Sequence, residues 1–203
     1  PIPRMYRIRY RIEGPKIDDI EGELRHRLAE CPAFGRVQKG QVIAVTVGSR
    51  GISNQPLVVK TLIDELKKVG TEPFVIPAMG SHAGADAKGQ KKMLEGLGFS
   101  EDYIGAPVKS SMEVVQIGTS PSGIPVYVDK YAYEADAIIL VNRIKAHTAF
   151  VGPIESGLIK MSVIGLGKQK GAETCHDLGF EQMSERLSEI AHFTLAKLPI
   201  LFG

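Results

Sequence analysis

The pattern that most constrains this chain is a buried strand, an amphipathic helix and a second buried strand in close succession. Residues 41–48 (QVIAVTVG) form an apolar run of strand length, and residues 72–78 (EPFVIPA) form another. Between them, residues 55–70 repeat apolar side chains at helical spacing, with Asn54 at the expected N-cap and Gly70 at the end. This order predicts a βαβ unit with parallel strands and a right-handed crossover.

Further elements are expected on both sides of this unit. Strand patterns occur at residues 5–12 and 136–142 and in a hairpin at 112–130 that turns at Pro121-Ser122-Gly123, and helical patterns occur at 17–30, 91–99 and 181–198. We therefore predict the α/β class, with a mostly parallel, Rossmann-like sheet, helices on both faces and a β-hairpin excursion. Residues 1–203 are expected to form a single domain.

Composition excludes several classes of protein. A formal net charge of +2, with dispersed lysines and arginines, does not favour nucleic-acid binding. The longest apolar runs, such as residues 137–141, are strand-sized and far below the roughly 20 residues of a membrane helix. Two cysteines, Cys31 and Cys175, provide no disulfide framework, so a reducing, cytoplasmic setting is expected.

Reactive side chains follow three of the predicted buried strands. Ser49 and Arg50 come after the first strand, and Gly80-Ser81-His82 comes after the second. The strand at 136–142 is followed by Arg143, Lys145 and His147. Because the carboxyl ends of parallel strands share one edge of a sheet, these groups are expected to converge on one functional site.

The segment from His147 to His176 is the richest in chemistry. It places Lys160 between two histidines and among many glycines. Imidazoles bind metals and transfer protons near neutral pH, and a lysine amine can bond to an acyl or carbonyl group. Glycines let the backbone approach a bound group such as a phosphate. We interpret this segment as part of a cofactor site.

The usual nucleotide motifs are absent from the same segment. The glycines at 152–160 lack the lysine that completes a phosphate-binding P-loop, and GLGKQKG at 165–171 is one residue too long for the dinucleotide fingerprint. A glycine-rich loop at 165–171 could still hold an anion, with Lys168 as its cation. A nucleotide- or phosphate-binding α/β protein therefore stays open as an alternative.

These residues resemble, in order and spacing, the nickel-dependent lactate racemase family, whose members racemise or epimerise 2-hydroxy acids. Ser49-Arg50-Gly51 resembles the family's arginine loop, and Gly80-Ser81-His82 resembles its first histidine loop. His147, Lys160 and His176 follow in the family's order. The sixteen residues from Lys160 to His176 agree with the family's spacing, whereas the thirteen from His147 to Lys160 are three more than usual.

The resemblance implies a lactate-like 2-hydroxy acid as substrate and a nickel pincer nucleotide as cofactor. It implies that Lys160 carries this cofactor covalently and that His176 is the protein ligand to nickel. His82 and His147 would be the two acid/base residues for hydride transfer between substrate and cofactor, and Arg50 would bind the substrate. Ser49, Gly157 and Lys168 are the further residues that we expect to contact the cofactor.

The resemblance also implies partners. The chain does not begin with methionine and ends in the apolar LPILFG, so we expect it to be the N-terminal, cofactor-holding domain of a longer two-domain protein. The missing C-terminal domain and the enzymes that build the cofactor would be its protein partners, whereas nucleic acid and membranes would not. A non-catalytic relative that retains the metal is a further alternative.

Overall fold

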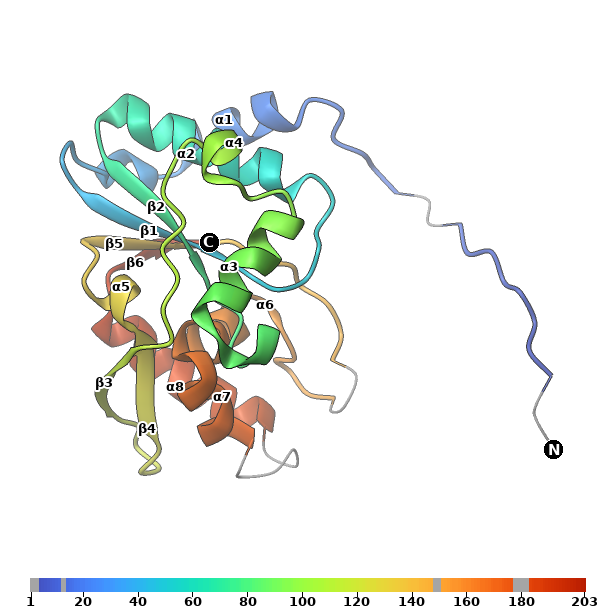
Figure 1. The fold of residues 1–203 in the computed structure, drawn as a ribbon, viewed down its shortest axis with the longest axis vertical. Coiled ribbons are helices and arrows are strands. Elements are labelled where there is room, and N and C mark those ends of the chain that lie inside the picture. Colours follow the sequence, from blue (N-terminus) through green and yellow to red (C-terminus); the bar gives the residue numbers. More distant parts are fainter. Residues whose placement is uncertain (1–3, 12–13, 148–150, 177–182) are drawn as a thin grey trace.

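The computed structural model describes residues 4–11, 14–147, 151–176 and 183–203 and consists of a four-stranded sheet, flanking helices and a separate hairpin (Figure 1). The strands are β1 (Val42–Val47), β2 (Glu72–Pro77), β3 (Val114–Thr119), β4 (Pro125–Asp129), β5 (Ala137–Leu140) and β6 (Ile200–Phe202). The helices are α1 (Ile20–Glu30), η1 (Phe34–Arg36), α2 (Gln55–Val69), η2 (Ala83–Ala85), α3 (Ala87–Gly96), α4 (Glu101–Ile104), α5 (Lys130–Tyr133), α6 (Gly157–Lys160), the π-helical turn η3 (Met161–Gly165), α7 (Leu166–His176) and α8 (Met183–Lys197).

The larger sheet has the order β2-β1-β5-β6, and all of its pairings are parallel. Val45 lies at its centre, paired with Val75 of β2 and Ile139 of β5. The parallel βαβ unit predicted from the sequence is therefore confirmed. Its helix α2 ends at Gly70, which has the left-handed φ of 89° that a terminating glycine supplies. Asn54 precedes the helix as predicted, but its side chain makes no capping hydrogen bond.

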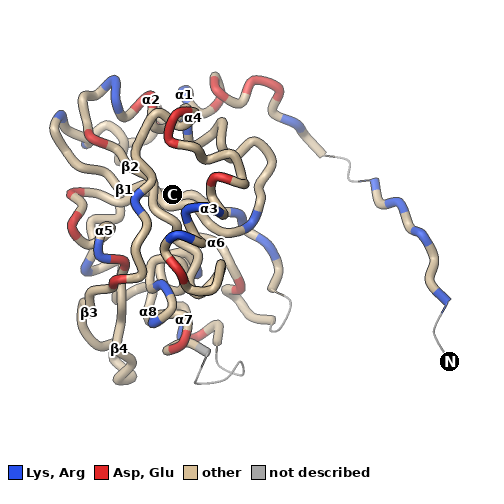
Figure 2. Tube along the Cα trace, in the orientation of Figure 1, with Lys and Arg blue, Asp and Glu red and all other residues tan. Residues whose placement is uncertain are grey.

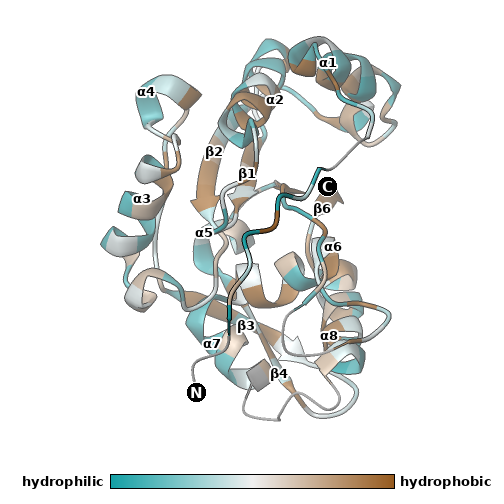
Figure 3. Cartoon of the chain, turned by 90° about the vertical axis from the view of Figure 1, so that its right-hand side faces the viewer, coloured by the Kyte–Doolittle hydropathy of each residue, from teal (hydrophilic) through white to brown (hydrophobic). Residues whose placement is uncertain are grey.

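Helical layers cover both faces of the sheet, as predicted. On one face, α1 and α2 bury apolar side chains such as Leu28 and Leu62 against Ile43 and Val45 of β1. The alternate residues of the strands point to the second core, which includes Ile138 of β5 and residues of α5, η3 and α7. The brown, apolar strands lie between these layers in Figure 3. Within the described residues, no helix combines the length and the apolar content needed to cross a membrane.

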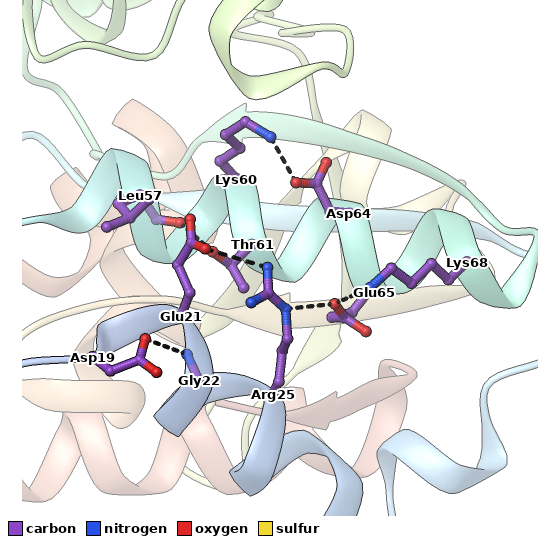
Figure 4. A network of polar contacts seen from close by, with 10 residues as sticks. All are labelled: Asp19, Glu21, Gly22, Arg25, Leu57, Lys60, Thr61, Asp64, Glu65 and Lys68. Carbon is purple, nitrogen blue, oxygen red and sulfur yellow. Dashed lines mark hydrogen bonds and ion pairs between the residues drawn. The ribbon is translucent and has the colours of Figure 1, made fainter.

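The outer surface of α1 and α2 carries a network of charged side chains (Figure 4). Arg25 of α1 lies 3.0 Å from the carboxylate of Glu65 on α2 and 3.4 Å from that of Glu21. Lys68 also binds Glu65, at 2.7 Å. Because these pairs are largely exposed, solvent screens them and they contribute little to stability. None of them lines the candidate site at the carboxyl ends of the strands.

The hairpin β3-β4 packs against the C-terminal helices instead of joining the main sheet. It turns at the predicted Pro121-Ser122-Gly123, and a third apolar cluster includes Val126 of β4, Val163 of η3 and Leu187 of α8. The apolar C-terminal segment includes β6, which pairs in parallel with β5.

Two expectations from the sequence were wrong. Residues 4–11 are extended and exposed and pair with no described strand, since an alternating pattern alone provides no hydrogen-bonding partner. They run away from the body of the domain with their arginines spread along them (Figures 1 and 2). Residues 165–171, expected to be a glycine-rich loop, instead span the end of η3 and the start of α7, and their helical backbone is interrupted by a kink at Lys168.

The glycine at 165 permits a close packing contact between η3 and the end of β2. A Cβ atom at this position would lie 2.9 Å from the backbone oxygen of Ala78. Neither backbone can move freely, because Gly165 and Ala78 are both buried. This glycine therefore lets the helical segment reach the sheet.

We predict that Gly165→Ala destabilises the domain by about 1–3 kcal/mol, since the added methyl group overpacks a buried backbone contact. Denaturant unfolding would measure this loss. Gly96→Ala, at the end of α3, is the matched control because a Cβ there meets no atom within 4 Å. Equal effects of the two substitutions would contradict the proposed packing role.

Candidate functional site

A cavity of about 690 Å³ lies beyond the carboxyl ends of β1, β2 and β5. The loops that follow these three strands line it, and so do residues from the segment 156–165. The strand order accounts for this position. The chain passes from β1 to β2 on one side of the sheet and later places β5 on the other side of β1. Such a reversal leaves a crevice outside the strand ends, where open α/β sheets bind ligands.

Among the residues that the structure describes, the lining of the cavity is basic and contains no carboxylate side chain. This distribution favours an anionic ligand, because the cations would otherwise repel one another in a partly enclosed space. The six basic side chains come from the three strand loops and from α6, and they are Arg50, His82, Arg143, Lys145, His147 and Lys160.

His82 lies at the end of the β2 loop and is held by the preceding β1 loop. Its ring nitrogen Nδ1 forms a hydrogen bond with the hydroxyl group of Ser49. Burial lowers the pKa of the His82 imidazole, and the charges of Arg50 and Lys160 lower it further. His82 is therefore neutral near pH 7, the form in which an imidazole accepts a proton.

The loop that carries His147 is folded around two acceptor side chains. The carboxylate of Glu155 accepts hydrogen bonds from the backbone N–H of His147 at 2.7 Å and of Gly152 at 3.1 Å. Both bonds lower the pKa of Glu155. The hydroxyl of Ser156 accepts from the backbone N–H of Lys145 at 2.8 Å and donates to the carbonyl of the same residue. Glu155 and Ser156 thus hold Lys145 and His147 at the cavity.

Lys160 is the half-buried lysine of the cavity. It ends α6 and is followed at once by the π-helical turn η3, a rare geometry that often marks functional sites. Burial lowers the pKa of its amine, and the neighbouring charges of Lys145 and Arg50 lower it further. A larger share of uncharged amine makes Lys160 a better nucleophile than an exposed lysine.

The sequence profile of the lactate racemase N-terminal domain matches residues 18–188, most of the chain. The chain belongs to this family. The lactate racemase apoprotein from Thermoanaerobacterium thermosaccharolyticum has a similar fold, with a TM-score of 0.65 and 13% sequence identity. The match covers 89% of this chain and 47% of that structure, so this lactate racemase-type domain spans about half of its length. A search of curated proteins finds no match.

The domain brings most of the predicted site residues to one place. Three residues predicted as catalytic and three predicted to contact a cofactor line the cavity, namely His82, His147, Arg50, Lys160, Ser49 and Gly157. Arg143 and Lys145, which the sequence placed at the site without a specific role, also line the cavity. Asn142 lines it too, and sequence reasoning did not select this residue. Its position at the end of the strand predicted at 136–142 was the available signal.

Lys168 lies elsewhere, and the side chain of His176 lies outside the described residues. Lys168 does not line the cavity, because its ammonium group is fully buried and lies 3.2 Å from the carboxylate of Asp129. His176 is the last residue of α7, and its side chain lies outside the described part of the structure. The neighbouring Cys175 is buried, which raises the pKa of its thiol to about 11.

We predict that Glu155→Gln loosens the His147 loop. An amide has one acceptor oxygen, whereas the carboxylate uses both oxygens for the N–H groups of His147 and Gly152. Faster amide hydrogen exchange at these two residues would show the effect, and Glu95→Gln on the exposed face of α3 is the control.

Acid should reproduce this loosening in the unmutated domain. The folded pKa of Glu155 is below its ordinary value of 4.5, so its contribution is present above that value and is lost as the pH falls through the lowered pKa. Protection factors, which correct the rates for the intrinsic pH dependence of amide exchange, would contradict the role of Glu155 if they stay constant across that range.

Proposed function

We propose that this domain binds the cofactor of a 2-hydroxy-acid racemase or epimerase, with a lactate-like substrate. The observation that carries the proposal is the meeting of Lys160, His82, His147 and Arg50 in one cavity, whose described lining holds no carboxylate, in a chain of the lactate racemase family. A 2-hydroxy acid is an anion, and its carboxylate suits a site lined by cations.

The residues of the cavity fit a nickel pincer nucleotide. The Lys160 amine, whose pKa is lowered, would form the covalent link, and Arg143 and Lys145 would offer charges to an anionic nucleotide. Within the described residues, no three His, Cys, Asp or Glu side chains gather into a metal site. That absence suits a metal that arrives with most of its ligands, to which His176 would add one imidazole. When bound, the cofactor would supply a centre that accepts a hydride and returns it.

The protein side chains would perform the acid/base steps. His82 follows β2 and His147 follows β5, whereas Arg50 follows β1, which lies between these two strands. The histidines therefore approach the cavity from opposite sides of the arginine. Arg50 would bind the carboxylate of the substrate, and each histidine would remove or return the hydroxyl proton of one enantiomer.

The proposal extends to partners and location. A second domain would complete the substrate site, because this chain spans about half of the lactate racemase structure it matches. Other enzymes would build and insert the cofactor. Both cysteines are free, in keeping with the reducing cytoplasm that we propose as its location.

The anion-binding alternative was based on a glycine-rich loop at residues 165–171, and these residues do not form such a loop. Residues 165–171 are helical, and the ammonium of Lys168 is buried against Asp129 away from the cavity. A phosphate ligand would instead meet Arg143 and Lys145, which is the same cavity. The tests below therefore also separate cofactor attachment from simple anion binding.

We predict that Lys160 gains a covalent mass increase, with about one equivalent of nickel, when the protein is produced together with the cofactor-building enzymes. Intact-protein and peptide mass spectrometry with metal analysis would measure both. Lys160→Arg keeps the charge but should abolish the adduct, and Lys145→Arg, another lysine of the cavity, should retain it. An unmodified Lys160 under conditions that load a related racemase would refute the cofactor proposal and favour an anion-binding or non-catalytic role.

We predict that racemisation which uses His82 as base persists below the ordinary histidine pKa of 6.5. The pKa of His82 is lowered, so the neutral base survives to lower pH and the rate falls only as the pH drops through that value. Rate–pH profiles of the complete, loaded protein would measure this limb. His82→Asn should slow turnover by about 100-fold or more. A limb above pH 6.5 would contradict the assignment.

A further inference from the structure

Lys168 is a fully buried lysine that the proposed chemistry leaves without a role. Its ammonium is surrounded by three acceptors from three separate segments. They are the backbone oxygen of Pro77 at 2.7 Å, the side-chain oxygen of Gln90 at 3.0 Å and a carboxylate oxygen of Asp129 at 3.2 Å. The ammonium donates hydrogen bonds to the first two of these oxygens, and its contact with Asp129 is an ion pair. The charge is therefore placed to join the ends of β2 and β4 to helix α3.

Gln90 extends this network to the loop that carries His82. The Gln90 side chain is fully buried and uses both ends of its amide. Its oxygen accepts from Lys168, and its nitrogen donates to the backbone oxygens of Gly80 at 2.9 Å and His82 at 3.2 Å. Because the ammonium can only donate, it dictates which end of the amide faces the loop.

The His82 loop requires such support because its backbone is unfavourable. Ala83 and Ala85 both have left-handed φ angles, 55° and 52°, which residues with a Cβ adopt at a cost. Lys168 itself has φ 54° and ψ −152°, a region that is otherwise almost restricted to glycine. Such conformations persist where surrounding interactions over-determine them.

Asp129 completes the arrangement at the end of the hairpin. One of its oxygens accepts from the backbone N–H of Ala132 at 3.1 Å, and the other faces Lys168. Burial raises the pKa of the Asp129 carboxyl and lowers that of the Lys168 amine, whereas their mutual attraction opposes both shifts. A buried pair of this kind stabilises one arrangement of its surroundings more than it stabilises the fold.

We propose that Lys168 is a positioning residue, which acts through Gln90 to hold the His82 loop in the conformation that presents the imidazole to the cavity. The proposal rests on the proposed function only in giving His82 a catalytic role. The network itself concerns the folded domain without cofactor. The sequence predicted that Lys168 contacts the cofactor. In this proposal it instead supports the base His82 indirectly, through Gln90.

The test compares Lys168→Met and Gln90→Met by NMR in the cofactor-free protein. Both substitutions keep an unbranched side chain and remove the polar link. We expect amide exchange at residues 80–85 to rise about tenfold or more, and the tautomer and titration of the His82 ring to change. The control is Thr194→Val, which removes a buried polar group elsewhere, the hydroxyl of Thr194 on α8. It should leave the His82 signals unchanged.

Two further variants separate positioning from general destabilisation. If Lys168 acts through Gln90, the double variant should change the His82 signals no more than either single variant does. Adding Ala83→Gly to Lys168→Met should partly restore the loop, because glycine tolerates the left-handed angle. If Lys168→Met does not fold, Gln90→Met alone carries the test.

The outcomes are distinct. Loss of stability with an unchanged His82 tautomer and unchanged loop exchange, or fully additive effects in the double variant, would overturn the positioning role. Because these readouts require neither cofactor nor turnover, they can fail while Lys160 still becomes modified. They can equally succeed in a protein that never binds nickel, so the two proposals are tested separately.

Discussion

The parallel pairing of β1 with β2 on one side and β5 on the other is the constraint on which the site depends. Val45 pairs with both neighbours, so the three strands end at nearly the same level. The loops that follow these strands therefore lie next to one another. They bring Arg50, His82 and His147 into one cavity, although Arg50 and His147 are nearly one hundred residues apart in the sequence. The buried hydroxyl of Thr46 in β1 accepts a hydrogen bond from the backbone N–H of Val141, the residue after β5, at 3.1 Å. This bond connects the two strands at their carboxyl ends.

Electrostatics distinguish this end of the sheet from the rest of the domain. On the outer surface of α1 and α2, several cations have a carboxylate partner, as Arg25 and Lys68 have in Glu65. In the cavity, the lining residues that the structure describes include cations and no carboxylates. Since that arrangement costs free energy in the empty protein, it indicates a site built for an anion. Burial and these neighbouring charges lower the pKa of both His82 and Lys160, which favours the uncharged forms that the proposed base and nucleophile require.

The buried ion pair between Asp129 and Lys168 connects the hairpin β3-β4 to the rest of the domain. Asp129 lies at the end of β4, and its contact with Lys168 ties the hairpin to the start of α7. Gln90 carries the connection to the β2 loop. The β3-β4 unit, which lies outside the main sheet, is therefore linked to the site by three buried polar side chains.

The sequence by itself determined the βαβ unit, the hairpin and the strand-end positions of Arg50, His82 and His147. Local periodicity and residue type carry that information, and parallel strands bring their carboxyl ends together without further instruction. It could not show that the segment at 4–11 pairs with no described strand or that residues 165–171 form kinked helix instead of a loop, because strand pairing and helix packing depend on distant neighbours. Only the tertiary structure decided that Lys168 faces Asp129 and Gln90 instead of the cavity. A lysine side chain is long and can point in many directions. Which one it takes depends on where the fold places a partner, here the buried carboxylate of Asp129.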